Sequence, residues 1–274
     1  AVLDNAEKRP DDARARIEAA IKRDPGNVQA YMVLLELRAA NGADRAELAG
    51  ILRKAVDGAP SSPIPRQLLV DHYLRGGETK EALAVAQQAV AALPDNAQLF
   101  DALGRAQSAN GEHNQAQASF NRMAALQPQS PEPYLRMAGA NLIAGDRTAA
   151  GQSWRKALEI DPRVLEAQQG LVRLAMAERK SDDALAMSRT VQKQRPKEAA
   201  GYALEGEIHV AEKAWDKAID VFRAGLKQVP ASGELAVRLH EVLVTAGKKS
   251  EADRLATEWQ RSHAKDATFP LYLG

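Results

Sequence analysis

Hydrophobic residues recur along this chain at the three- and four-residue intervals that place them on one face of a helix. The segment 97–130 has two such apolar stripes, formed by Leu99, Phe100, Leu103 and Ala106 and then by Ala116, Phe120 and Met123. Asn110 and Gly111 interrupt the pattern between the two stripes, and Pro128 ends it. The segment therefore predicts two amphipathic helices joined by a glycine turn.

The same unit returns along the chain at a fixed period. Prolines recur every 34 residues at Pro60, Pro94, Pro128, Pro162, Pro196 and Pro230. Small residues recur at Ala82, Ala116, Ala150, Ala184, Ala218 and Ala252. Turn glycines recur at Gly42, Gly77, Gly111, Gly145 and Gly247. A repeat of this length predicts a helical solenoid, in which each pair of helices packs against its neighbours.

These three registers divide residues 1–274 into a single predicted solenoid of seven complete repeats. The complete repeats are 28–62, 63–96, 97–130, 131–164, 165–198, 199–232 and 233–266, and the partial ones are 1–27 and 267–274. Because the chain starts and stops inside a repeat, we expect it to be a fragment with apolar ends. Phe269, Leu271, Tyr272 and Leu273 are then predicted to promote end-to-end self-association.

The repeated motif resembles the tetratricopeptide repeat (TPR) across the entire chain. The family's Leu-Gly pair, small residue, large residue and terminal proline correspond to Leu103-Gly104, Ala116, Phe120 and Pro128. This resemblance implies an all-α fold, a TPR α-solenoid in which antiparallel helix pairs form a right-handed superhelix. It also implies a scaffold that binds other proteins.

A narrower resemblance lies in the C-terminal half. Residues 192–228 and 246–274 are similar to the TPR-repeat lipoprotein family of the PEP-CTERM/exosortase system (PrsT). That similarity implies a periplasmic or outer-membrane-anchored protein of a Gram-negative bacterium, active in envelope protein sorting and exopolysaccharide export. The lipidated cysteine and signal of that family do not occur in this sequence.

Composition narrows the classes of function. The chain has 37 basic and 36 acidic residues, and only 4% of its residues are aromatic. Single-stranded RNA binding by a helical-repeat protein is an alternative function, but the neutral charge and few aromatic residues disfavour it. No apolar stretch reaches the roughly 18 residues of a transmembrane helix.

The sequence has no arrangement typical of catalysis, and no cofactor is expected. It lacks cysteine, HExxH and a glycine-rich phosphate loop. His209 and His240 fall on consecutive first helices, but without a third ligand they favour packing between helices over a zinc site. The chain is therefore predicted not to be an enzyme, although it could be the substrate-recruiting arm of an enzyme that lies outside this fragment.

The predicted binding surface is the concave groove that the first helix of each pair lines. The side chains expected on this groove are Glu36, Asp71, Arg75, Asp101, Arg105, Leu135, Leu142, Arg173, Met176, Glu207, Val210, Glu241 and Val244, with Arg136 and Arg238 at its edge. Arg105, Arg136 and Arg173 come from consecutive repeats, which suggests a cationic middle between acidic ends. Such arginines could hold a carboxylate of a protein or peptide ligand. The alternative is a mixed, solvated face without a strong site.

Overall fold

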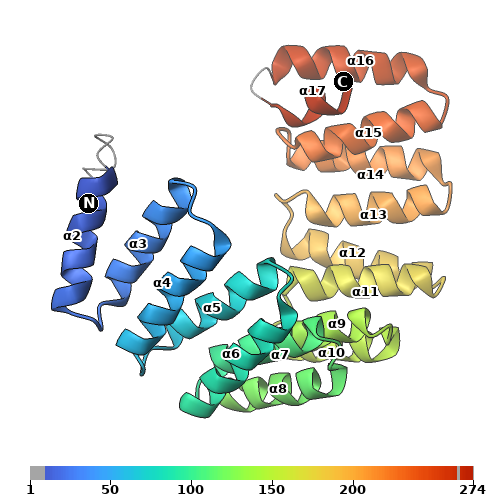
Figure 1. Cartoon of the computed structure of the whole chain (residues 1–274). Helices are drawn as coiled ribbons and strands as arrows, with labels where there is room; N and C mark the ends of the chain where they lie inside the picture. Colours follow the sequence, from blue (N-terminus) through green and yellow to red (C-terminus); the bar gives the residue numbers. More distant parts are fainter. Residues whose placement is uncertain (1–9, 264–265, 274) are drawn as a thin grey trace. The chain divides into compact units, whose positions relative to one another are not determined.

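In the computed structural model, residues 10–263 and 266–273 are described, and all regular elements in these ranges are helices (Figure 1). Residues 1–9 and 274 of the two predicted partial repeats lie outside the described residues. The all-α solenoid of helix pairs predicted from the sequence is confirmed. The chain divides into two compact units, residues 1–146 and 147–274, which are described separately.

The first unit contains eight described helices, two in each of its three complete predicted repeats, one before them and one after them. They are α2 (Pro10–Arg23), α3 (Val28–Ala40), α4 (Arg45–Gly58), α5 (Pro63–Arg75), α6 (Thr79–Ala92), α7 (Ala97–Ala109), α8 (His113–Leu126) and α9 (Glu132–Ile143). The even-numbered helices from α4 onward are the second helices of their repeats. The boundary between the units separates α9 from its sequence partner, so the single-solenoid organisation remains a prediction.

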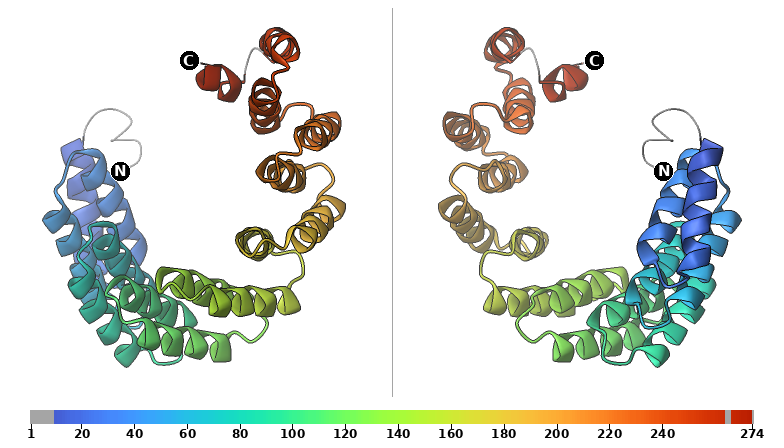
Figure 2. Two further views of the ribbon diagram at one scale, coloured as in Figure 1. Left: turned by 90° about the vertical axis from the view of Figure 1, so that its right-hand side faces the viewer. Right: turned by 90° about the vertical axis from the view of Figure 1, so that its left-hand side faces the viewer.

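The second unit continues the alternation. Its helices are α10 (Arg147–Ile160), α11 (Leu165–Ala177), α12 (Ser181–Gln194), α13 (Ala200–Ala211), α14 (Trp215–Gln228), α15 (Gly233–Thr245), α16 (Lys249–Ser262) and α17 (Thr268–Leu273). Figure 2 shows helices α11–α16 nearly end-on, alternating between two layers. First helices contact the first helices of the next repeat, as α5 does with α7 and α13 with α15. This layer of first helices is therefore the closely packed side of each unit.

The turns between paired helices use left-handed backbone. Gly42, Gly77, Gly111, Gly145 and Gly247 have φ between 74° and 82°. Arg179 and Lys213 occupy the two positions that the glycine series skips, and they adopt φ of 59° and 57°. The turn geometry is thus repeated even where the residue type is not, because the packing of the helices on either side holds it.

A helix glycine packed beneath an aromatic ring joins the two helices of a repeat. The fully buried Phe120 ring lies over Gly104, and Phe222 lies over Gly206 in the same way. A Cβ added at Gly104 would lie within 2.7 Å of three Phe120 ring carbons. Glycine therefore serves here for close approach of two helices, at some cost in helix propensity.

We predict that Gly104→Ala destabilises the first unit by about 1–3 kcal/mol, because the added methyl group overpacks the Phe120 contact. The matched control is Gly50→Ala, inside α4, where an added Cβ meets nothing within 4 Å. That control should be neutral or stabilising by up to about 1 kcal/mol, since alanine favours a helix. Urea unfolding followed by circular dichroism measures both. Equal effects of the two substitutions would contradict this packing.

The short helix α17 packs on α15 and α16 through an aromatic cluster. Phe269 is fully buried against Trp259, so it is not part of an exposed end as the sequence had suggested. Asp266 accepts hydrogen bonds from Trp259 Nε1 at 2.7 Å and from the Thr268 amide at 3.0 Å. The Trp259 bond, more than any other contact, lowers the pKa of Asp266. Leu271 remains 80% exposed, and self-association through it remains a prediction.

Candidate functional site

A chain of ion pairs crosses three first helices of the first unit. Arg105 of α7 contacts Asp71 of α5 at 2.8 Å and Asp101 of its own helix at 2.8 Å. Arg136 of α9 contacts Asp101 at 2.7 Å and Glu132 at 2.8 Å. Two arginines therefore link three carboxylates, and Asp101 is shared between both arginines.

This network corrects the expected cationic middle of the groove. Asp101 is only 6% exposed, so it is not freely available to a ligand. Burial lowers the pKa of Arg105, but the neighbouring Asp101 and Asp71 carboxylates raise it further, and the net shift is upward. The guanidinium groups of Arg105 and Arg136 are satisfied within the protein. Both side chains form ion pairs with a residue of the preceding repeat and so connect neighbouring repeats.

The other predicted groove residues of the first unit do not gather at one point. Glu36 lies exposed on α3, and Leu142 lies exposed near the end of α9. Arg75 is also exposed, and its Nε donates to the backbone oxygen of Asp71 at 3.2 Å. Leu135 is buried and belongs to the packing of α9.

In the second unit, the predicted groove residues converge on one pocket of about 560 Å³. It lies between α13, α15 and α17, and its lining includes Glu207, Val210, Arg238, Glu241, Val244 and Tyr272. Val210 and Val244 occupy equivalent positions one repeat apart, as do Glu207 and Glu241. The pocket thus combines an aliphatic row with an acidic row.

Sequence reasoning missed Tyr272 as part of this surface. Tyr272 follows Arg238 by one period of 34 residues, so extending the repeat frame into the last helix would have found it. Its hydroxyl lies 3.1 Å from His240 Nδ1, and the two rings meet edge to face. Burial, and then the charge of Glu241, raise the pKa of the Tyr272 hydroxyl.

Arg173 and Met176 of α11 occupy the positions equivalent to Glu207 and Val210 one repeat earlier, but they do not line the pocket. Arg173 is exposed, and Met176 is half-buried against the packing of α11 and α12. The structure therefore brings together five of the seven groove residues predicted in this unit, counting Arg238. The two on α11 lie outside the pocket.

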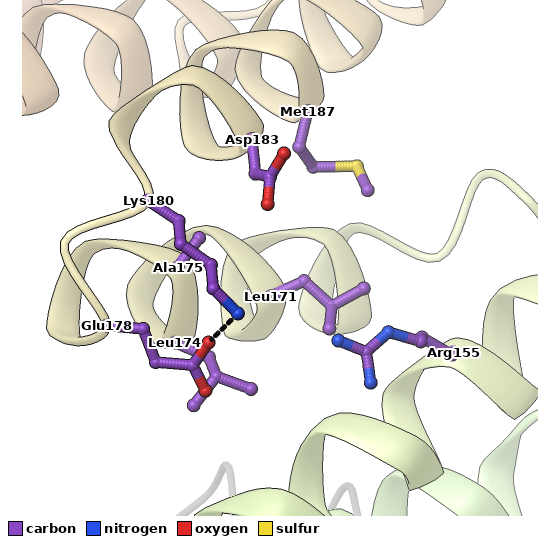
Figure 3. Close-up of a pocket in the computed structure, with 8 residues that line it drawn as sticks. All are labelled: Arg155, Leu171, Leu174, Ala175, Glu178, Lys180, Asp183 and Met187. Carbon is purple, nitrogen blue, oxygen red and sulfur yellow. Dashed lines mark ion pairs between the residues drawn. The ribbon is translucent and has the colours of Figure 1, made fainter.

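Two smaller cavities lie where a first helix meets the second helices on either side of it, and both have charged residues of both signs. Figure 3 shows one of about 200 Å³, where Leu171 lies between Arg155 and the Lys180–Glu178 ion pair of 2.7 Å, and Leu174 and Met187 complete the apolar lining. The other, of about 430 Å³, lies among α2, α3 and α4. Its charged lining contains the pairs Arg14–Glu18 and Arg38–Glu47, and Lys54 is a further cation. Neither cavity has an excess of negative charge in its lining.

The two histidines considered for zinc serve in packing. His209 is buried, with Nδ1 3.7 Å from a Glu212 carboxylate oxygen, whereas His240 contacts Tyr272. Across residues 10–263 and 266–273, no group of three histidine, cysteine, aspartate or glutamate side chains is placed to hold a metal ion. Among the helices in those same ranges, none combines the length and the apolar character needed to cross a membrane.

Comparison with known protein families agrees with the geometry. Residues 6–63 and 170–233 match the tetratricopeptide repeat family. The fold is a TPR solenoid. The family match and the helix-pair architecture together support a TPR protein. A search of curated protein sequences finds no match to this chain.

Solved structures show the same TPR fold at low sequence identity. Yeast Tom70 is 14% identical with a TM-score of 0.61, and the match covers 93% of this chain and 55% of Tom70. A tetratricopeptide repeat protein from Parabacteroides merdae is 14% identical with a TM-score of 0.54, covering 90% and 99%. Cut9, from an APC/C hetero-tetramer with Hcn1, is 18% identical with a TM-score of 0.50, covering 96% and 52%. The chain spans about half the length of Tom70 and of Cut9.

Proposed function

We propose that this TPR chain is a non-catalytic scaffold that binds a segment of another protein on the first helices of its second unit. The observation that carries the proposal is the pocket of about 560 Å³ between α13, α15 and α17. Its aliphatic and acidic side chains come from different repeats, so a ligand there would touch several repeats at once. Cut9, which has the same fold, was crystallised in a complex with the protein Hcn1.

The setting we propose is the envelope of a Gram-negative bacterium. The chain would act in the periplasm or anchored to the outer membrane, where it would help sort C-terminally tagged exported proteins or export exopolysaccharide. The similarity of residues 192–228 and 246–274 to the PEP-CTERM-system lipoproteins supports this setting. These stretches include α13 and α17, which line the pocket together with α15, and α14, which contributes Phe222.

Site-specific photo-crosslinking in living cells of the source organism would test both parts of the proposal. We expect a photoreactive residue at Val244, on the pocket, to give a discrete adduct with one protein. The matched control is the same residue at Thr257, which is exposed on the second helix α16 of the same repeat. No adduct at Val244, or equal adducts at both positions, would contradict binding at this surface. An adduct with a protein that is not exported would contradict the envelope setting.

A further inference from the structure

The pocket between α13, α15 and α17 has an excess of negative charge. Arg238 is its only cation, and it pairs with Glu207 and with Glu234, the latter at 3.1 Å, within the described part of the chain. Glu241 has no cation within ion-pair distance among the described residues, and it lies exposed on the pocket wall. One carboxylate therefore faces the pocket with its charge uncompensated. A cationic ligand group would compensate that charge.

Beside this carboxylate lies an exposed apolar surface. Val244 is 52% exposed although it is aliphatic, and Val210 and Tyr272 extend the same surface. Phe222 and Val242 lie beneath it and are buried. Covering Val244 with an aliphatic group would remove apolar area from water, which favours binding. The pocket thus offers one polar and one apolar contact side by side.

The spacing of the helices relates these two contacts to a peptide. Packed helices lie about 8–10 Å apart, so the step from Val210 on α13 to Glu241 on α15 is of that size. An extended chain covers this distance in about three residues. A peptide that places a basic side chain at Glu241 would therefore place an aliphatic side chain on Val210 about three positions away.

We propose that this pocket binds an extended peptide in which a lysine or arginine lies about three residues from an aliphatic residue. The inference rests on the proposed scaffold function and names the chemistry of its ligand. The uncompensated carboxylate selects the basic residue, because a glutamate there would be repelled by Glu241. Neither of the two smaller cavities described above has an excess of negative charge in its lining, so neither would select a basic residue.

Fluorescence anisotropy with the full chain would test this inference. The probes are fluorescein-labelled nonapeptides of glycine and serine that carry lysine at position three and leucine at position six. Matched peptides replace the lysine by glutamate or the leucine by serine. We expect the lysine–leucine peptide to bind most tightly, and its affinity to fall as salt is raised.

Charge reversal of the pocket gives the decisive comparison. Glu241→Lys should weaken the lysine–leucine peptide about tenfold and should make the glutamate peptide the better ligand. The control Glu258→Lys makes the same charge change on the exposed face of α16 and should leave both affinities unchanged. Equal binding of the lysine and glutamate peptides, or equal effects of the two reversals, would overturn the inference.

Two further outcomes separate this inference from the scaffold proposal. A crosslinked partner at Val244 together with no preference for the lysine peptide would overturn the ligand chemistry and leave the scaffold function standing. A dimer in sedimentation that Glu241→Lys dissociates would overturn the peptide proposal, because a second copy of the chain would then occupy the pocket.

Discussion

Phe120→Ala is expected to lower the free energy of unfolding by about 3–5 kcal/mol, the usual cost of removing a buried aromatic ring. The ring is only 1% exposed and packs with Ala97, Ala116 and Met123. It also covers Gly104, which has no side chain to fill the space that alanine would leave. Neighbouring helices can close such a cavity only in part. Urea unfolding followed by circular dichroism measures the loss.

Phe100→Ala is the matched control for this prediction. Phe100 lies on α7 of the same repeat but is half-buried, with the Arg122 guanidinium 6.0 Å from its ring centroid. Because water already reaches part of this ring, its removal should cost clearly less than removal of Phe120. If the two alanine variants unfold at the same urea concentration, the ring of Phe120 does not hold the repeat together as described.

Asp101→Asn is expected to cost about 2–3 kcal/mol, because it removes the negative charge shared by two charge-assisted hydrogen bonds and replaces one of the two acceptor oxygens by an NH2 donor. Arg105 Nε donates to one carboxylate oxygen at 2.8 Å, and Arg136 Nε donates to the other at 2.7 Å. The side chains of Asp101 and Arg105 are 9% and 28% exposed, so the solvent screens this pair less than it screens an exposed ion pair. The substitution keeps the shape of the side chain, and urea unfolding therefore reports the loss of charge.

The control for this prediction is Asp95→Asn. Asp95 pairs with Arg122 at 3.2 Å, but its side chain is 83% exposed, and exposed ion pairs contribute about 0–1 kcal/mol. A loss for Asp101→Asn no larger than for Asp95→Asn would mean that the ion-pair network contributes little to stability.

The same network affects the variant Arg105→Glu, which would add a third acid beside Asp71 and Asp101. Any loss of binding in that variant has to be separated from loss of folding.

The sequence by itself determined the local structure of this protein. The 34-residue ladders place Gly111 in the turn between α7 and α8, and Pro128 two residues after α8 ends at Leu126. Helix periodicity, turn glycines and terminal prolines act over a few residues, so they can be read directly from the chain. For the same reason, the repeat frame identified which residues lie on the first helices.

Only the tertiary structure decided which of those residues a ligand can reach. Arg105 shares its repeat position with Glu241, and Asp101 lies one turn earlier on the same helix, yet the first two are paired inside the protein and Glu241 is not. Ion pairing and burial depend on side-chain positions across helices one repeat apart, to within about an ångström. A pattern of residue types does not contain that information. The packing of α13, α15 and α17 around one pocket supplies it.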